Sequence, residues 1–400
     1  MNIQRASGGL LLCTVLYLLA ASLSYAEDGV KDDEIILGSS LALEGHSSFL
    51  GTQTQHGALA YINSINEKGG VNNRKIKIIS YDDGYDPEKC EANTRKLIEQ
   101  DKVFALCNYV GTPTTLKALP LIQKAHIPLL GLFTGSEAFR HPVIKEVFSV
   151  RSSYYQETQS IVTKFWDIFG VRKFAVFFQN DAYGQAGLKG VEMALEKLGT
   201  TPVAAASYER GTNVIADALD KIREAKPEAV IMVGTYTPSA NFVLSAKWSN
   251  FDPYFHSVSF VGAEELARLI GTGQDSEGVI ITQVVPPQNS PNPALQEYHD
   301  LLKKYYPADK PNFVSLEGFI NAKVLVAVLS KMGKNASREE FIKSAESLHN
   351  LDVGLDHTIS FDPKNHQGSD AVYLTVIKNG EYQLITDDIW KSMKKRGVTQ

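Results

Sequence analysis

The sequence lacks the residue patterns that build metal centres and covalent catalytic sites. Its 400 residues include 3 cysteines and 9 scattered histidines, and neither a His-x-x-x-His nor a His-Glu-x-x-His spacing occurs. A Gly-x-Ser-x-Gly elbow and a phosphate-binding Walker loop are also missing. These absences argue against an enzyme, so we expect no catalytic residues, no metal site and no cofactor.

Excess positive charge is absent too. The formal net charge is -5, and charged residues make up 21% of the chain. A protein that binds nucleic acid or an anionic membrane usually carries a basic patch, so neither partner is expected. Hydrophobic residues make up an ordinary 44%. At this length two domains are expected, because one core rarely serves 400 residues.

Long apolar runs are confined to the N-terminus. Residues 1–26 contain one cation (Arg5), no acid, an apolar stretch at 10–23 and the small-x-small end Ser24-Tyr25-Ala26. This pattern predicts a secretory signal peptide cut after residue 26. A membrane anchor is the alternative, but about 14 apolar residues are fewer than the ~20 that span a bilayer. A lipid anchor at Cys13 is a weaker alternative. We expect a soluble, exported mature chain without a further membrane span.

Two cysteines, Cys90 and Cys107, remain after cleavage at that site. In an oxidising compartment a disulfide between them is plausible. The alternative is a pair of buried thiols, because sequence alone does not give the distance between them. We predict the bridge.

Short apolar runs alternate with amphipathic segments, which predicts βα units around parallel sheets. The first series comprises strands 35–41, 76–81, 103–106 and 128–132 and helices 54–68, 88–100 and 116–125. A second series comprises helices 156–169, 188–198, 215–224 and 240–250 and strands 174–178, 203–208, 229–233, 255–261 and 279–284. After a proline-rich crossing we predict helices 295–306, 316–331 and 338–347, then strands 358–361 and 372–377 with an Asn379-Gly380 turn.

Five polar loops follow the carboxyl ends of predicted strands. Ligands of open α/β sheets bind at these ends, and the loops carry Gly, Thr, Ser, Tyr and Glu, which suit a small-molecule site. The loops are Asn108-Tyr-Val-Gly-Thr112, Leu132-Phe-Thr-Gly-Ser136, Asn180-Asp-Ala-Tyr183, Val233-Gly-Thr-Tyr236 and Val261-Gly-Ala-Glu264.

These loops, taken in order, resemble those of the type I periplasmic solute-binding proteins, the leucine/isoleucine/valine-binding family of ABC importers. Further matching segments are Asn66-Glu-Lys-Gly-Gly-Val-Asn-Asn-Arg74 and Tyr81-Asp-Asp…Asp86-Pro87, so the likeness covers essentially the whole mature chain. It implies an α/β fold with two Rossmann-like lobes, each with a parallel central sheet, and a hinge of three crossovers. We place the N-terminal lobe at 33–152 plus 287–361 and the C-terminal lobe at 153–286 plus 362–400.

In the N-terminal lobe the resemblance implies that Gly111 and Thr112 hold a ligand carboxylate. Thr112 precedes Pro113, so it could equally be a helix N-cap, and both roles are compatible. Thr134 and Ser136 correspond to a second turn that contacts the ligand's carboxylate and amine. The alternative for Ser136 is an ordinary turn in which its hydroxyl bonds to the backbone.

In the C-terminal lobe Tyr183 and Tyr236 correspond to two tyrosines that cover the ligand on closure, with simple packing as the alternative. Glu264 corresponds to the acid that pairs with the ligand's α-amino group. An acid at a helix N-terminus is favourable in any case, and Glu265 is adjacent, so a purely structural role is the alternative.

This chain also departs from the family pattern. The loop 44–50 carries one extra residue, which puts Phe49 or Leu50 at the position for side-chain selectivity. The segment 151–155, ending at Tyr155, is bulkier than its counterpart. Neither Tyr85 nor Gly111, which match the family's disulfide positions, is a cysteine.

The resemblance implies a monomeric periplasmic receptor that delivers a small carboxylated solute, in first place an amino acid, to an inner-membrane ABC permease. An aromatic or other organic acid without an amine is the alternative ligand. A ligand-sensing component of a signalling system is the alternative role.

Overall fold

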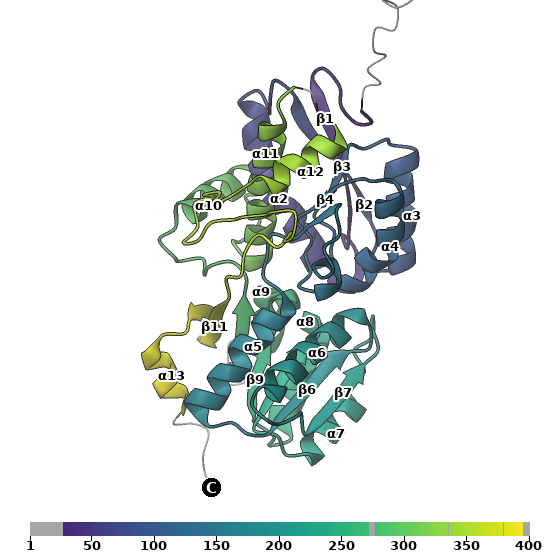
Figure 1. Ribbon diagram of the computed structural model, residues 1–400. Helices are drawn as coiled ribbons and strands as arrows, with labels where there is room; N and C mark the ends of the chain where they lie inside the picture. Colours follow the sequence, from purple (N-terminus) through teal and green to yellow (C-terminus); the bar gives the residue numbers. More distant parts are fainter. Residues whose placement is uncertain (1–26, 272–276, 335, 379, 395–400) are drawn as a thin grey trace, which may run out of the picture.

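The computed structural model describes residues 27–271, 277–334, 336–378 and 380–394, and it contains two α/β units, one above the other in Figure 1. The predicted signal peptide and Asn379 of the predicted turn lie outside these residues. The mixed α/β class with parallel sheets in two lobes is confirmed.

The first unit is built on a five-stranded parallel sheet in the order β2-β1-β3-β4-β5. Helices α3 and α4 cover one face, and α2 and α11 cover the other, as Figure 1 shows. The elements of this unit are β1 (Glu34–Leu41), α2 (Ser48–Glu67), β2 (Lys75–Asp82), α3 (Pro87–Glu99), β3 (Ala105–Cys107), α4 (Thr112–Lys124), β4 (Leu129–Leu130), β5 (Val147–Phe148), α10 (Pro293–Tyr305), α11 (Phe313–Met332) and α12 (Arg338–Glu346), with 3-10 turns at Gly45–Ser47 and Glu137–Phe139.

The second unit has a seven-stranded sheet in the order β12-β11-β10-β9-β8-β6-β7. Strands β6 to β10 pair in parallel, whereas β11 and β12 are antiparallel. The elements are α5 (Tyr154–Lys164) continued by a π-turn (Phe165–Phe169), β6 (Phe174–Gln179), α6 (Ala182–Glu196), β7 (Ala204–Tyr208), α7 (Ala216–Glu224), β8 (Ala229–Val233), α8 (Tyr236–Trp248), β9 (Tyr254–Ser257), a 3-10 turn η4 (Ser259–Val261), α9 (Ala263–Ile270), β10 (Ile280–Gln283), β11 (Tyr373–Lys378), β12 (Glu381–Leu384) and α13 (Asp387–Lys394).

The chain passes between the two units three times, in segments 149–153, 284–292 and 367–372. The first and third segments run together, because Ser149 bridges to Gln367. We propose these segments as the hinge and as the places where the two domains divide.

Helices that follow the strand-end loops begin earlier than we predicted. Helix α4 starts at Thr112 instead of residue 116, α6 at Ala182 instead of 188, and α8 at Tyr236 instead of 240. We predicted that each helix begins at its first regularly spaced apolar residue. The first turn of these helices instead carries the polar residues of the preceding loop. The candidate site residues therefore sit on helix N-terminal turns, whose partial positive charge favours anions.

Two strand predictions are wrong. Residues 358–361 contribute only the isolated bridge of Ile359 to Leu351, because the apolar side chains Ile359 and Phe361 pack into the core without a neighbouring strand. The strand predicted at 255–261 ends at Ser257 and continues as η4, after which Gly262 has φ 75°. This turn takes Phe260 out of the sheet and into the contact between the units.

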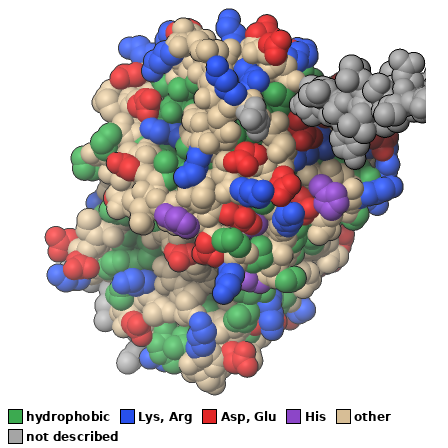
Figure 2. Space-filling model, turned by 45° about the horizontal axis from the view of Figure 1, so that its top comes forward, with side chains coloured by type: hydrophobic (Ala, Val, Ile, Leu, Met, Phe, Trp, Pro, Cys, Tyr) green, Lys and Arg blue, Asp and Glu red, His purple; other side chains and the backbone are tan. Residues whose placement is uncertain are grey.

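Helix α11 is long and apolar enough by composition to cross a membrane, but most of it is buried in the protein. It packs along α2, which is typical of a core helix. On the face of the molecule drawn in Figure 2, Lys and Arg side chains are interspersed with Asp and Glu side chains.

Candidate ligand-binding site between the two units

Two threonine hydroxyls from the first unit form the centre of the candidate site. The Thr112 and Thr134 hydroxyls share a hydrogen bond of 2.7 Å, and both side chains are fully buried. Gly111 precedes them with φ 99°, and a Cβ there would lie 2.3 Å from the Tyr85 ring. Because Gly111 is the N-cap of α4 and no side chain caps this helix, the Thr112 hydroxyl does not act as a helix cap. Its hydrogen bond is made to Thr134, and not to the start of the helix.

Aromatic rings from both units surround this pair. The Tyr154 ring lies 5.4 Å from Tyr183, and Tyr183 lies 4.6 Å from Phe260. Phe260 in turn contacts Phe133 at 5.5 Å and Tyr85 at 5.9 Å, both from the first unit. The Tyr154 hydroxyl lies 3.4 Å from the Thr134 hydroxyl. These five rings and the two threonines, which we call the central cluster, join the two units directly.

Burial fixes the protonation state of the tyrosines. It raises the pKa of Tyr154 to about 12 and raises the pKa of Tyr183 well above its ordinary value. Both phenols are therefore neutral near pH 7 and can donate hydrogen bonds. The Tyr183 hydroxyl donates to the Gly234 carbonyl at 3.3 Å. A carboxylate in this cluster would meet hydroxyl donors and flat apolar faces together.

A buried arginine, Arg151, extends the cluster into the first crossing segment. Its guanidinium lies 5.4 Å from the Phe133 ring centre and 5.8 Å from that of Tyr154. It donates to Glu157 at 2.9 Å and to Glu317 at 3.3 Å, and its Nε has no partner. Burial opposes this charge, but the two carboxylates outweigh it and raise the pKa of Arg151. The site thus holds a permanent cation with one free donor.

A second buried arginine, Arg140, holds the turn that carries Thr134 and Ser136. It donates to the Ser136 carbonyl at 2.7 Å, the Thr134 carbonyl at 3.3 Å and the Arg151 carbonyl at 3.2 Å. Its Nε donates to Gln367 of the third crossing at 2.9 Å. Burial lowers the pKa of Arg140 to about 10, so it stays charged near pH 7. Arg140 therefore ties the turn to two hinge segments.

Ser136 lies beside the cluster in a local turn. Its amide donates to the Thr134 hydroxyl at 3.2 Å, and its own hydroxyl accepts from the Ala138 amide at 3.4 Å. This is the turn geometry that we weighed as the alternative to a ligand contact.

Three other predicted residues lie at contacts between the units that are separate from the central cluster. The Phe49 ring stands edge-on to Tyr236 with ring centres 6.3 Å apart. One carboxylate oxygen of Glu264 accepts from the Phe313 amide, at the start of α11, at 2.8 Å. Its other oxygen is buried without a partner, and burial raises the pKa of Glu264 to about 7. The structure thus places Glu264 against α11, and no contact joins it to Thr112 or Thr134.

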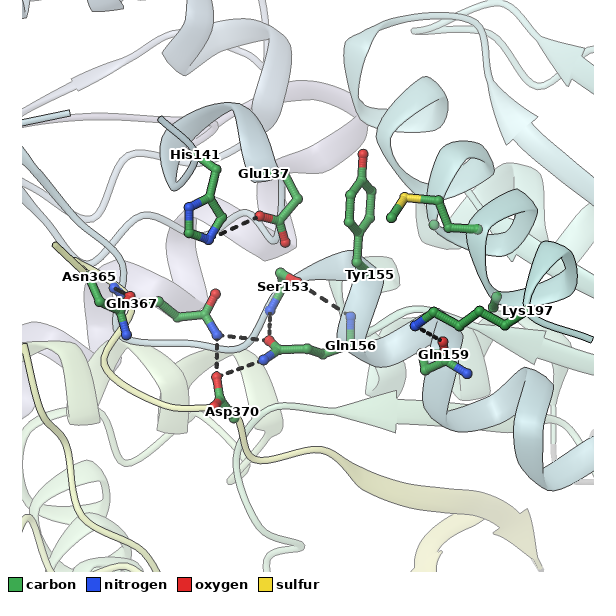
Figure 3. A pocket seen from close by; sticks show the side chains of 13 residues that line it. Glu137, His141, Ser153, Tyr155, Gln156, Gln159, Lys197, Asn365, Gln367 and Asp370 are labelled. Atoms are coloured by element: carbon green, nitrogen blue, oxygen red, sulfur yellow. Dashed lines mark hydrogen bonds and ion pairs between the residues drawn. The ribbon is translucent and has the colours of Figure 1, made fainter. Parts of the chain in front are cut away.

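Tyr155 lies away from both groups. It lines a pocket of about 340 Å³ beside the hinge, together with residues of α6 and the third crossing (Figure 3).

The predicted disulfide is wrong, because Cys90 and Cys107 are both buried free thiols. Cys107 on β3 packs into the core on the α2 side of the sheet, whereas Cys90 on α3 packs into the core on the opposite side. The sheet separates the two sulfurs. In the part of the chain that the structure describes, no three His, Cys, Asp or Glu side chains gather as a metal site.

Sequence reasoning missed five residues that shape the central cluster and its support. Tyr85 and Phe260 were read as parts of a turn and a strand, and Arg151 and Tyr154 only as a bulky segment. The bulk of the segment 151–155 was the available signal for Arg151 and Tyr154. These four residues and Arg140 are large side chains that the structure buries: Tyr85, Arg140, Arg151, Tyr154 and Phe260.

Comparisons with known proteins show the family of this chain and its relatives. A family model described as "Periplasmic binding protein" matches residues 34–381. The chain is 24% identical over 316 residues to an amino acid binding protein of Pseudomonas aeruginosa, covering 78% of this chain and 83% of that protein.

Among solved structures the chain resembles a possible leucine/isoleucine/valine-binding protein from Rhodopirellula baltica. The TM-score is 0.84 at 33% identity, covering 92% of this chain and 99% of the other. A fatty acid ABC transporter substrate-binding protein from Thermomonospora curvata has a TM-score of 0.82 at 20% identity, covering 91% and 95%. This second likeness concerns the fold alone.

Proposed function

Because the chain belongs to the type I periplasmic binding proteins of the leucine/isoleucine/valine-binding family, we propose that it captures a small carboxylated solute in the central cluster and delivers it to an ABC permease. The observation that carries the proposal is the buried Thr112–Thr134 hydroxyl pair, enclosed by tyrosines and Arg151. The mature receptor would act in the periplasm as a monomer.

The capture would use donors that are fixed before the ligand arrives. Arg140 holds the Thr134 turn, and Glu157 and Glu317 hold the Arg151 guanidinium. Fixed donors lose little entropy on binding, which favours affinity for a small ligand. Tyr183 on α6 belongs to the other unit, so closure about the hinge would complete the site. Hinge closure around a ligand is the motion for which periplasmic binding proteins are a standard example.

An amino acid is the first candidate ligand. One oxygen of Glu264 is buried without a partner, and an ammonium group would satisfy it. The similar protein of Pseudomonas aeruginosa is described as an amino acid binding protein. In this assignment Glu264 is shared between the Phe313 amide and the ligand.

An aromatic or other organic acid without an amine is the second candidate. The five aromatic rings of the central cluster favour this ligand class. Glu264 favours it too, because this carboxylate contacts α11 and not the central cluster, where it could pair with an amine. Apolar rings offer faces for an aromatic ligand.

Native mass spectrometry of the mature protein, purified from the periplasm without refolding, tests the proposal. The released ligands are identified, and amino acids and their deaminated acids are then titrated by calorimetry. Saturable binding of either class that Thr112→Ala weakens would support the cluster as the site. If neither class binds at millimolar concentration, the proposal is wrong.

A further inference from the structure

A polar pocket of about 340 Å³ lies beside the hinge, outside the central cluster (Figure 3). Four parts of the chain form it. Glu137 and His141 come from the loop after β4, Tyr155 and Lys197 from α5 and the end of α6, and Asp370 from the third crossing segment. Its walls therefore belong to both units and to the hinge between them.

The floor of this pocket is held by hydrogen bonds among its own side chains. Asp370 accepts from the amides of Gln156 at 2.6 Å and Gln367 at 2.5 Å. The Gln156 amide oxygen in turn accepts from the Ser153 backbone amide at 2.7 Å and from Gln367 at 2.8 Å. A floor that is already ordered costs little further entropy when a small molecule binds.

Opposite charges stand at opposite ends of the pocket. Figure 3 shows Asp370 on one side of the pocket and Lys197 on the other, whereas Glu137 lies beside His141, with which it forms an ion pair at 4.0 Å. The Lys197 ammonium donates to the neutral Gln159 amide at 2.7 Å. Among the described residues no carboxylate lies within ion-pair distance of Lys197, and no cation lies within that distance of Asp370. Both ends therefore keep charge that a ligand could balance.

We propose that this pocket binds a small linear zwitterion, with its ammonium toward Asp370 and its carboxylate toward Lys197. The methylene chain would lie along the Tyr155 ring. Because the walls come from both units, an occupant would contact both and favour the arrangement seen here. This second site does not depend on the solute proposed for the central cluster.

Titration calorimetry of the full mature chain tests the proposal. The probes are unbranched ω-amino acids from glycine to 6-aminohexanoate, with hexanoate and hexylamine as singly charged controls. We expect saturable binding of at least one of these zwitterions and at least tenfold weaker binding of both controls. Lys197→Met should weaken binding of that zwitterion about three- to tenfold, as expected for an exposed ion pair in a pocket.

Two control variants make the result specific. Lys189→Met lies on the same helix, is exposed and does not line the pocket, so it should leave the affinity unchanged. Thr112→Ala, by contrast, reports on binding in the central cluster and distinguishes it from binding in this pocket. The proposal is overturned if no zwitterion of the series binds saturably. It is also overturned if Lys197→Met and wild type bind alike, or if Thr112→Ala abolishes binding that Lys197→Met retains.

Discussion

Glu264→Gln separates the two ligand classes, because the carboxylate lies at a contact between the units and has one free oxygen. The substitution keeps the shape and an oxygen that can accept from the Phe313 amide. An ammonium bound to the free oxygen would lose its charged partner, which costs ~2–5 kcal/mol, or roughly thirty- to several-thousandfold in affinity. A deaminated ligand makes no such pair, so its affinity should not fall; at pH 8.5 it should rise, because the neutral amide avoids the cost of burying an unpaired carboxylate.

The pH dependence of ligand affinity provides a second, independent test of the role of Glu264. Burial raises the pKa of Glu264 from 4.5 to about 7. The carboxylate therefore binds its proton more tightly when the units are in contact than when it is exposed to solvent. Its contribution to closure is fully present below pH 4.5 and is lost as pH rises through about 7. At ~1.4 kcal/mol per pH unit this contribution is about 3 kcal/mol at most.

Calorimetry between pH 5.5 and pH 8.5, on wild type and on both variants Glu264→Gln and Glu265→Gln, measures these effects. A deaminated acid should bind wild type about ten- to thirtyfold more weakly at the higher pH. An amino acid should show the opposite trend, because its ammonium stabilises the ionised carboxylate. Glu265, which pairs with Arg268, is the matched control on the same helix turn. Equal losses for both ligand classes on Glu264→Gln, or wild-type affinities that do not depend on pH, would refute the reasoning.

Three further changes test other parts of the structure. Thr112→Ala should weaken solute binding about ten- to a hundredfold, the value of a hydrogen bond to a charged group. It should lower the melting temperature only slightly, because it removes the hydrogen bond to Thr134 but no helix cap. A large fall in melting temperature with unchanged calorimetric affinity would contradict this. Arg140→Lys should reduce the free energy of unfolding by about 2–4 kcal/mol in urea, because lysine cannot span the four acceptors that Arg140 reaches. Arg95→Lys, on an exposed residue, should change it little, and equal effects would argue against the role of Arg140. Cys90 and Cys107 should react with a thiol reagent only in denaturant, and dithiothreitol should not move the melting temperature; a fall on reduction would indicate a disulfide.

Much of the fold follows from local pattern. The six residues of β6 are all buried, as a short apolar run between two amphipathic segments predicts. The Asp86-Pro87 pair begins α3, with the Asp86 carboxylate accepting from the amides of Glu88 and Lys89. Such signals act within a few residues, so sequence reveals them. The strand predicted at 358–361 failed because a strand also needs a neighbour, and no local signal supplies one.

The sequence by itself determined the alternation of strands and helices and the polar residues at the strand ends. Tertiary structure alone decided which of those residues meet. It brought Thr112 to Thr134, and it put Cys90 and Cys107 on opposite sides of one sheet. It also directed Glu264 to α11 and Tyr155 to the hinge pocket. The reason is physical: a local pattern fixes the face of a strand or helix on which a side chain lies, whereas the partner on the other side depends on how the two units pack.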